Sequence, residues 1–445
     1  MWEASTPTVS KAPNPSTAST ASRAQRELDV VLHGASGFTG RLVAAHLAAH
    51  APAGVRVGLS GRSADRVAAV RRGLGPVAVG WPVLVADAAD PTALAALAGR
   101  TRVVLSTVGP YARHGLPLVA ACAAAGTDYA DLTGEVTFVR RSIDAHHETA
   151  VASGARIVHA CGFDSVPSDL GVLLLHERAL ADGAGGLTDT TYVLTDVRGG
   201  ISGGTLESLR GLLDDARDDP EARRVIADRY ALSPDRDGEP DRDGDIDSEP
   251  DSDGEPDRDS STMAVHRDDS LGGWVGPFAM AAFDTRVVRR SNALQGWAYG
   301  RSLRYREVVG FGSGPAAPVV AQVASAAVGL GVLGLSRRPT RALLDRVLPR
   351  AGSGPSERTR RNGRFRVEIS TRTTSGRRYT AVVAGRGDPG YAATAVLLGE
   401  SGLCLALDRD RLPPGGGVLT PATALGDALA DRLRAAGLTL EVQER

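Results

Sequence analysis

The feature that most constrains the fold of this chain is a short apolar run followed at once by three evenly spaced glycines. Residues 28–33 read LDVVLH, and GASGFTG then places Gly34, Gly37 and Gly40 ahead of a helix-like stretch. The first glycine permits a tight turn, the second lets the backbone approach a diphosphate, and the third lets the helix pack closely on the strand. The pattern predicts a Rossmann-type dinucleotide-binding domain beginning near Glu27. A glycine-rich loop that only makes the turn is the alternative.

The residues that follow alternate between short apolar runs and helix-length segments rich in Ala and Leu. This alternation is typical of a doubly wound parallel sheet with right-handed crossovers. Two of the runs, RVVLST and RIVHA, are almost continuously apolar, as strands buried on both faces are. We therefore predict an α/β first domain over residues 27–168. Its predicted strands are 28–33, 55–60, 83–86, 102–107, 128–131 and 156–160.

Beyond residue 168 the periodicity changes and predicts a second, α+β domain over residues 169–445 with an antiparallel sheet. The clearest signal is a hairpin of 364–373 and 377–386, whose alternating residues flank a turn at Ser375 and Gly376. Residues 420–445 are expected to pack back on the first domain. Further predicted elements are helices at 169–181, 204–217, 390–406 and 422–436, and strands at 190–197 and 438–443.

Two segments lack the apolar residues needed for a core. Residues 1–26 are rich in Ser, Thr, Ala and Pro without the apolar centre of a signal peptide, and we predict a disordered tail. Residues 234–261 hold thirteen acids against three arginines and one isoleucine, which predicts a disordered insertion. The insertion lacks the spaced glycine and closing glutamate of a calcium loop. Three scattered cysteines lack CxxC spacing, so we predict no metal site and a reducing, cytoplasmic compartment.

The formal net charge of −1 conceals a basic remainder, because the insertion carries most of the excess acid. A basic surface suits phosphate-bearing ligands or anionic lipid, and no aromatic-interleaved basic motif indicates nucleic acid. Residues 315–335 are apolar apart from Gln322 and Ser325, and arginines follow them. Since Ala and Gly dominate this stretch, we expect a buried or interfacial hairpin rather than a true membrane span. It would lie in the core, in a homodimer interface or at an anionic membrane surface.

The residues at the end of the second predicted strand indicate whether NAD or NADP binds, because an acid there would bind the ribose hydroxyl of NAD. Residues 57–63 read VGLSGRS and contain no acid. Arg62, with Ser63 or Arg66, would instead meet a 2′-phosphate, which predicts NADP(H). The alternative is a solvated arginine in an arginine-rich chain.

Further candidates follow the third and fourth predicted strands, at the carboxyl ends where such sheets bind ligands. Asp87 could approach the adenine, while Thr107 and Gly109 lie where the nicotinamide should be. Tyr111 and His114 could then donate a proton after hydride transfer. A turn with a packed Tyr111 is an equally good interpretation.

Acidic residues follow the fifth and sixth predicted strands. Asp131, Glu135 and Asp164 could orient a substrate or accept hydrogen bonds from backbone amides. Of these, Asp164 is the catalytic candidate beside Tyr111. Ser168 and Asp169 could simply cap the next helix.

These motifs together resemble the saccharopine dehydrogenase-like oxidoreductase family, specifically its actinobacterial branch of trans-acting enoyl reductases. The resemblance covers the chain except the tail and the acidic insertion, and His33 departs from it. It maps cofactor binding onto Gly34, Ser36, Gly37, Phe38, Thr39, Gly40 and Arg62 but supplies no catalytic acid. The segments that carry it are GASGFTGRLVAAHL, LSGRSADRV, TVGPYARHGLPLVAACAAAGTDYADLTGE, HACGFDSVPSDLGVLLLHE, GGISGGTLES and GGGVLTPATALGDALADRL.

The resemblance implies NADPH-dependent reduction linked to glycolipid or polyketide-lipid assembly, with membrane or lipid-surface association. We therefore predict an enoyl reductase-like enzyme for a lipid-linked substrate, cytoplasmic, with a peripheral position at the inner face of the plasma membrane as one option. A saccharopine reductase-like amino-acid dehydrogenase is the first alternative. A non-catalytic NADP(H)-sensing protein is the second.

Overall fold

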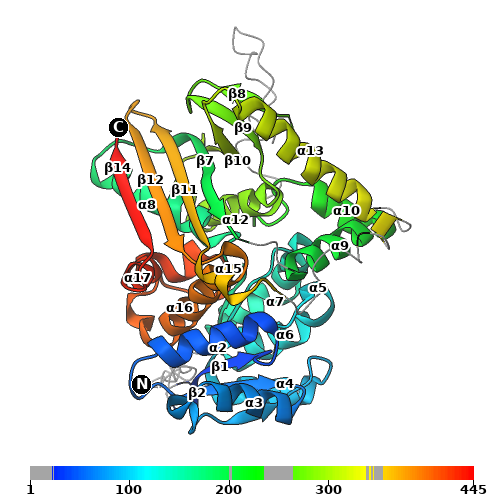
Figure 1. The fold of residues 1–445 in the computed structure, drawn as a ribbon. Coiled ribbons are helices and arrows are strands. Elements are labelled where there is room, and N and C mark those ends of the chain that lie inside the picture. The colour runs from blue at the N-terminus through cyan, green and yellow to red at the C-terminus, as the bar shows by residue number, and fades with distance from the viewer. Residues whose placement is uncertain are drawn as a thin grey trace, which may run out of the picture.

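The computed structural model describes residues 25–199, 203–234, 264–336 and 354–445, together with Arg23, Thr340, Arg341 and Leu344. Nearly all of the predicted tail and of the predicted acidic insertion lie outside these residues. The described residues form two seven-stranded sheets with helices packed around them (Figure 1).

The first sheet, sheet A, is parallel throughout, with the strand order β13-β6-β5-β4-β1-β2-β3. It confirms the predicted α/β fold class, and the six predicted strands form within two residues of their expected bounds. Its strands are β1 (Leu28–His33), β2 (Val57–Gly61), β3 (Val83–Val85), β4 (Thr101–Ser106), β5 (Asp128–Asp131), β6 (Arg156–Val158) and β13 (Gly417–Leu419).

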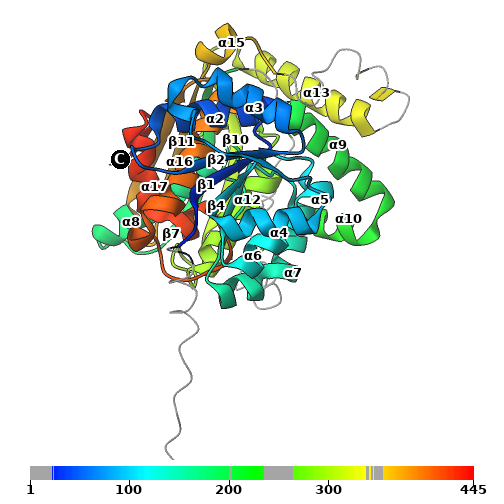
Figure 2. The same ribbon diagram turned by 90° about the horizontal axis from the view of Figure 1, so that it is seen from below.

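Helices cover both faces of sheet A, which explains why its central strands are apolar without alternation (Figure 2). On one face lie α2 (Phe38–His50), α3 (Ala64–Gly73) and α16 (Thr394–Leu407). On the other lie α4 (Pro91–Arg100), α6 (Leu116–Ala125) and α7 (Val136–Ser153). The short helix α5 (Tyr111–His114) follows β4.

The second sheet, sheet B, has the order β14-β12-β11-β7-β10-β9-β8. It is antiparallel as predicted except that β7 and β10 run parallel, and the predicted hairpin forms with Arg372 opposite Arg378. One face packs on α8 (Val166–Ala181), α12 (Ala281–Leu294) and α17 (Pro421–Ala435). The strands are β7 (Leu187–Arg198), β8 (His266–Asp268), β9 (Gly273–Pro277), β10 (Arg304–Gly312), β11 (Arg364–Thr373), β12 (Arg378–Arg386) and β14 (Thr439–Glu444).

The two sheets share one hydrophobic core. Leu32 and Leu105 of sheet A belong to the same buried cluster as Leu170 of α8 and Ile369 of β11. The C-terminal part of the chain contributes to both sheets, because β13 is an edge strand of sheet A and β14 is an edge strand of sheet B. The remaining elements are α9 (Gly203–Asp218), α10 (Pro220–Ala227), α15 (Glu357–Arg361) and the short turns Pro76–Ala78, Pro389–Ala393 and Arg409–Arg411.

The apolar stretch at 315–335 was expected to form a buried or interfacial hairpin, and the hairpin and the burial are wrong. It forms one continuous helix, α13 (Ala317–Ser336), which packs on β9, β10 and α9 along one side only. Among the described residues two helical segments are long and apolar enough to cross a membrane, α13 and Pro389–Leu407. The second is 72 % buried and belongs to the core, whereas α13 is only 11 % buried.

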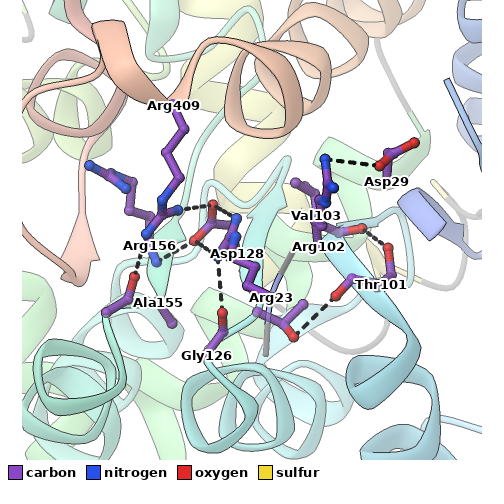
Figure 3. Close-up of polar contacts among 12 residues, drawn as sticks. Arg23, Asp29, Thr101, Arg102, Val103, Gly126, Asp128, Ala155, Arg156 and Arg409 are labelled. Atoms are coloured by element: carbon purple, nitrogen blue, oxygen red, sulfur yellow. Dashed lines mark hydrogen bonds and ion pairs between the residues drawn. The ribbon is translucent and has the colours of Figure 1, made fainter. Parts of the chain in front are cut away.

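At the amino end of β5, a buried carboxylate gathers several arginines (Figure 3). Asp128 accepts hydrogen bonds from the backbone amide of Arg156 at 2.8 Å and from the guanidinium groups of Arg409 at 3.0 Å and Arg23. This arginine cluster joins three parts of the chain that are far apart in sequence. Because parallel sheets bind ligands at their carboxyl ends, the cluster lies away from the candidate site and is structural.

Candidate active site

The loop between β1 and α2 has the shape that a dinucleotide diphosphate requires. Gly34 has φ +87°, and a Cβ there would lie 2.7 Å from the Oγ1 of Thr107. A Cβ on Gly40 would collide with the carbonyl oxygen of Gly34. No described side chain caps the N-terminus of α2 after Gly37, so its first backbone amides can bind an anion. The residues present therefore fit an NADP(H) diphosphate.

The cofactor residues predicted at 36–40 lie in the loop after β1 and in the first helical turn of α2. Ser36, Phe38 and Thr39 are partly exposed there. The ring of Phe38 also contacts the second domain, since it lies edge-on to Tyr391 at 4.7 Å and below the guanidinium of Arg360 at 5.2 Å. Phe38 thus joins the glycine loop to α15 and to the turn before α16.

Arg62 directly follows β2 and is exposed. Its guanidinium forms no hydrogen bond or ion pair with the described residues, which leaves it available to a phosphate. Ser63 is the N-cap of α3 and accepts a hydrogen bond from the backbone amide of Arg66 at 3.4 Å. The geometry is compatible with the predicted contact between Arg62 and a 2′-phosphate.

The other predicted cofactor residues lie along the same edge of sheet A. Asp87 is exposed after β3, and its carboxylate accepts a hydrogen bond from the backbone amide of Ala89 at 2.9 Å. The hydroxyl of Thr107 donates to the carbonyl oxygen of Gly34 at 3.2 Å and so ties the end of β4 to the glycine loop. Gly109 is exposed two residues further on.

Tyr111, one of the two catalytic candidates, is buried with its hydroxyl fully used. The hydroxyl donates to the carbonyl oxygen of Ser106 at 3.0 Å and accepts from the backbone amide of Leu132 at 3.3 Å. Burial raises its pKa well above the usual value. This geometry favours the packing interpretation over a role as proton donor. His114, on the same short helix, is exposed.

Asp131 and Glu135 act as hydrogen-bond acceptors inside the protein. Asp131 binds the ring of His159 at 2.8 Å and the backbone amide of Ala160 at 3.1 Å. Glu135 accepts from the backbone amides of Tyr111 at 3.1 Å and Ala112 at 2.7 Å. Their carboxylates therefore stabilise the loops at this edge, which is the second of the two roles predicted for them.

Ser168 and Asp169 do not cap α8, so that prediction is wrong. The helix begins at Val166, and both side chains are buried in its first turn. Asp169 accepts hydrogen bonds from Ser291 of α12 and from the backbone amide of Ala422 at 2.7 Å. It connects three helices, because tertiary contacts rather than capping satisfy its carboxylate.

Asp164, the other catalytic candidate, has a free carboxylate. It lies in the loop between β6 and α8 and forms no hydrogen bond or ion pair with the described residues. An added Cβ on Gly134, which follows β5, would lie 4.0 Å from its Oδ2. Burial raises the pKa of Asp164 to about 6. Asp164 therefore lies at the carboxyl edge of sheet A with its oxygens available.

Two acids near Asp164 were missed by the sequence reasoning. Asp284 of α12 and Glu307 of β10 are both buried, and this burial is the main reason why the pKa of each is raised; the charge of Asp164 adds to the rise. They come from elements distant in sequence, so no local spacing marked them. The sequence offered one signal for Glu307, which is an acid next to an apolar run in REVVGF.

A cavity of about 210 Å³ opens beside this edge, between α5, α7 and α9. Arg113 and Arg141 line it together with Glu207 and Asp214. Its wall includes Glu135 and Pro110, so it adjoins the end of β4 where the nicotinamide is expected.

Comparison with known proteins identifies the family. The saccharopine dehydrogenase NADP binding domain matches residues 30–158. A Mycobacterium tuberculosis protein named as a trans-acting enoyl reductase is 54 % identical over 420 residues, covering 94 % of this chain and 97 % of the relative. The trans-acting enoyl reductase of Mycobacterium bovis is 50 % identical over 424 residues, covering 94 % and 98 %. The chain belongs to the trans-acting enoyl reductase family.

The predicted resemblance is thereby confirmed, and with it an NADP-dependent oxidoreductase. The saccharopine dehydrogenase (L-Glu forming) of Saccharomyces cerevisiae has the same fold, with a TM-score of 0.53 over 94 % of this chain and 99 % of that one. At 14 % identity this likeness shows the fold alone. The fold shared with that enzyme spans both sheets of this chain.

Proposed function

We propose that this enzyme uses NADPH to reduce the carbon–carbon double bond of an enoyl group on a lipid- or polyketide-type substrate in glycolipid biosynthesis. The observation that carries the proposal is the likeness to relatives named trans-acting enoyl reductases over 94 % of the chain. That span includes the second domain as well as the cofactor domain. The likeness therefore extends beyond the cofactor domain.

Residues along one edge of sheet A would bind the cofactor and supply the proton. The backbone at Gly34 and Gly37 would hold the diphosphate, and Arg62 the 2′-phosphate. Thr107 and Gly109 would border the nicotinamide, which supplies a hydride when bound. Asp164 faces the same edge with free carboxylate oxygens and would pass a proton to the substrate.

We further propose that α13 holds the enzyme against an anionic membrane surface, where a lipid-linked substrate would be found. Seven large apolar side chains of α13 are exposed, and arginines follow the helix in the sequence. Basic residues near an anionic leaflet contribute about 1 kcal/mol each. The exposed side chains are Val319, Val320, Val323, Val328, Leu330, Val332 and Leu333.

The activity is tested by mixing the protein with NADPH and trans-2-enoyl thioesters of coenzyme A with short and long acyl chains. Loss of NADPH absorbance, with the saturated thioester identified by mass spectrometry, is expected and should favour long chains. Saccharopine with NADP⁺ serves as the comparison substrate. Turnover of saccharopine but of no enoyl thioester would replace the proposal with amino-acid dehydrogenation.

Membrane attachment is tested by flotation with anionic and neutral vesicles at low and high salt. Binding to anionic vesicles at low salt is expected, and Val323→Asp with Leu330→Asp should abolish it. A protein that stays in solution and sediments as a dimer would show that α13 is a subunit interface.

A further inference from the structure

The ring of Phe38, at the start of α2, lies among side chains from both domains. We call the group of Phe38, Arg41, Arg360 and Tyr391 the Phe38 clamp. The guanidinium of Arg360, from α15, lies over the ring at 5.2 Å from its centroid, and that of Arg41, from α2, lies at 5.9 Å (Figure 1). Tyr391 meets the ring edge-on at 4.7 Å. The second domain therefore reaches the first turn of the helix that follows the glycine loop.

Arg360 is held in a fixed position by packing and hydrogen bonds. A Cβ on Gly354 would lie 2.4 Å from the ring of Phe38, so the segment before α15 lies directly against the clamp. The guanidinium of Arg360 donates to the carbonyl oxygen of Pro355 at 2.7 Å, and its backbone carbonyl accepts from the amide of Asp388 at 3.0 Å. The remaining N–H groups of this guanidinium have no hydrogen-bond acceptor among the described residues.

The start of α2 carries positive charge without a matching acid. Its first backbone amides have no side-chain cap, and its first turn contains no acidic residue. The helix dipole is positive at this end, so the guanidinium groups of Arg41 and Arg360 add to a potential that is already positive. Two cations at an uncapped helix N-terminus are unfavourable by themselves and become favourable once an anion binds there.

Asp388 is the acid whose charge interacts with Arg360, but it forms no ion pair with it in the described part of the chain. Its carboxylate accepts a hydrogen bond from the backbone amide of Ala392 at 3.2 Å and so caps the turn before α16. Burial raises the pKa of Asp388, while the bond from Ala392 and the charge of Arg360 oppose that rise. The positive charge of the Phe38 clamp is therefore not neutralised by direct contact.

We propose that Arg360 binds the diphosphate of NADP(H) together with the start of α2, so that both domains hold the cofactor. A guanidinium offers parallel N–H donors that fit two phosphate oxygens, and Arg360 is already oriented by Phe38 and Pro355. Arg41 supports the loop, because it donates to the carbonyl oxygen of Ser36 at 3.0 Å. This inference depends on NADP(H) binding and not on which substrate is reduced.

The proposal gives Arg360 a role that differs from that of Arg62. The diphosphate is common to NADPH, NADH and ADP, whereas the 2′-phosphate expected at Arg62 belongs to NADPH alone. Loss of the charge at Arg360 should therefore weaken all three ligands by a similar factor. For a hydrogen bond between charged groups we expect about a 10- to 150-fold rise in Kd.

The experiment is calorimetric titration of NADPH, NADH and ADP into the parent, Arg360→Met and Arg360→Lys. Methionine keeps an unbranched side chain over the ring of Phe38 but has no charge, whereas lysine keeps the charge. Arg360→Met should weaken all three ligands about 10- to 150-fold, and Arg360→Lys should restore most of the affinity. The loss in Arg360→Met should become smaller at high salt.

The matched control is Arg358→Met, because Arg358 is an exposed arginine on the same short helix. It should leave the Kd of all three ligands unchanged. Thermal melting of the ligand-free variants checks that the fold is intact, which is expected because Arg360 is partly exposed.

Three results would overturn the proposal. Parent-like affinity of Arg360→Met for NADH and ADP would remove the contact with the diphosphate. Equal weakening by Arg360→Met and Arg360→Lys would show that the shape of the side chain matters and its charge does not. An effect confined to NADPH would assign Arg360 to the 2′-phosphate. None of these measurements needs turnover, so a failure of the proposed enoyl reduction would leave the test of Arg360 intact.

Discussion

Arg62→Ala is expected to weaken NADPH binding strongly and NADH binding little. The side chain lies at the carboxyl end of β2 and is exposed, without a hydrogen bond or ion pair to the described residues. Its removal should therefore leave the fold unchanged. The whole effect on affinity then reports the contact with the 2′-phosphate, which only NADPH carries.

The expected size follows from the kind of contact. A hydrogen bond between charged groups contributes about 1.5–3 kcal/mol, which corresponds to roughly a 10- to 150-fold change in Kd. Because Arg62 is exposed, salt should screen the contact, and the lower end of this range is expected at high ionic strength.

Calorimetric titration of both cofactors into the parent and the variant measures the effect directly. Arg72→Ala is the matched control, since Arg72 is an exposed arginine further along α3, and it should leave both affinities unchanged. Equal affinity of the parent for NADH and NADPH, or equal weakening of both cofactors in Arg62→Ala, would refute the assignment of Arg62.

Four further predictions follow. Gly40→Ala should lower the free energy of unfolding by about 1–3 kcal/mol and weaken NADPH, because the new Cβ collides with the Gly34 carbonyl; a thermal shift with and without NADPH checks this. Asp128→Ala should cost about 3–5 kcal/mol in urea unfolding, since it leaves the arginine cluster without its carboxylate. Glu307 binds its proton more tightly when folded, so its burial costs stability increasingly from about pH 4.5 to about pH 8; Glu307→Gln should melt higher than the parent at pH 9 and equally at pH 4. Replacing residues 234–261 by a short Gly/Ser linker should leave the melting temperature and NADPH affinity unchanged, because the segment has almost no apolar area to bury.

The sequence by itself determined the elements whose cause is local. A Cβ at Gly34 or Gly40 would clash with its neighbours, and a Cβ at Gly37 would lie only 3.2 Å from the carbonyl oxygen of Gly34, so the spacing of the glycines encodes the turn directly. The central strands β1 and β4 of sheet A carry apolar runs without alternation because helices cover both faces, and β11 alternates because one face of sheet B packs on helices. In each case the residues of one short segment are enough to predict the element.

Tertiary structure decided the conformation and the side-chain roles of segments that contact residues far away in the sequence. Residues 315–335 carry the same apolar composition whether they form a hairpin or a helix, and contacts with β9, β10 and α9 accompany the helix. Asp169 looks like a cap in the sequence, but Ser291 and Ala422 satisfy its carboxylate.

The candidate acids show the same division. Asp164 could be singled out because it follows a predicted strand, whereas Asp284 and Glu307 lie on α12 and β10 and were not found. Periodicity reports which face of an element is apolar, but it does not report which buried groups from different elements meet. The proton environment of the site depends on that meeting, because burial and neighbouring charge set the pKa of each carboxyl.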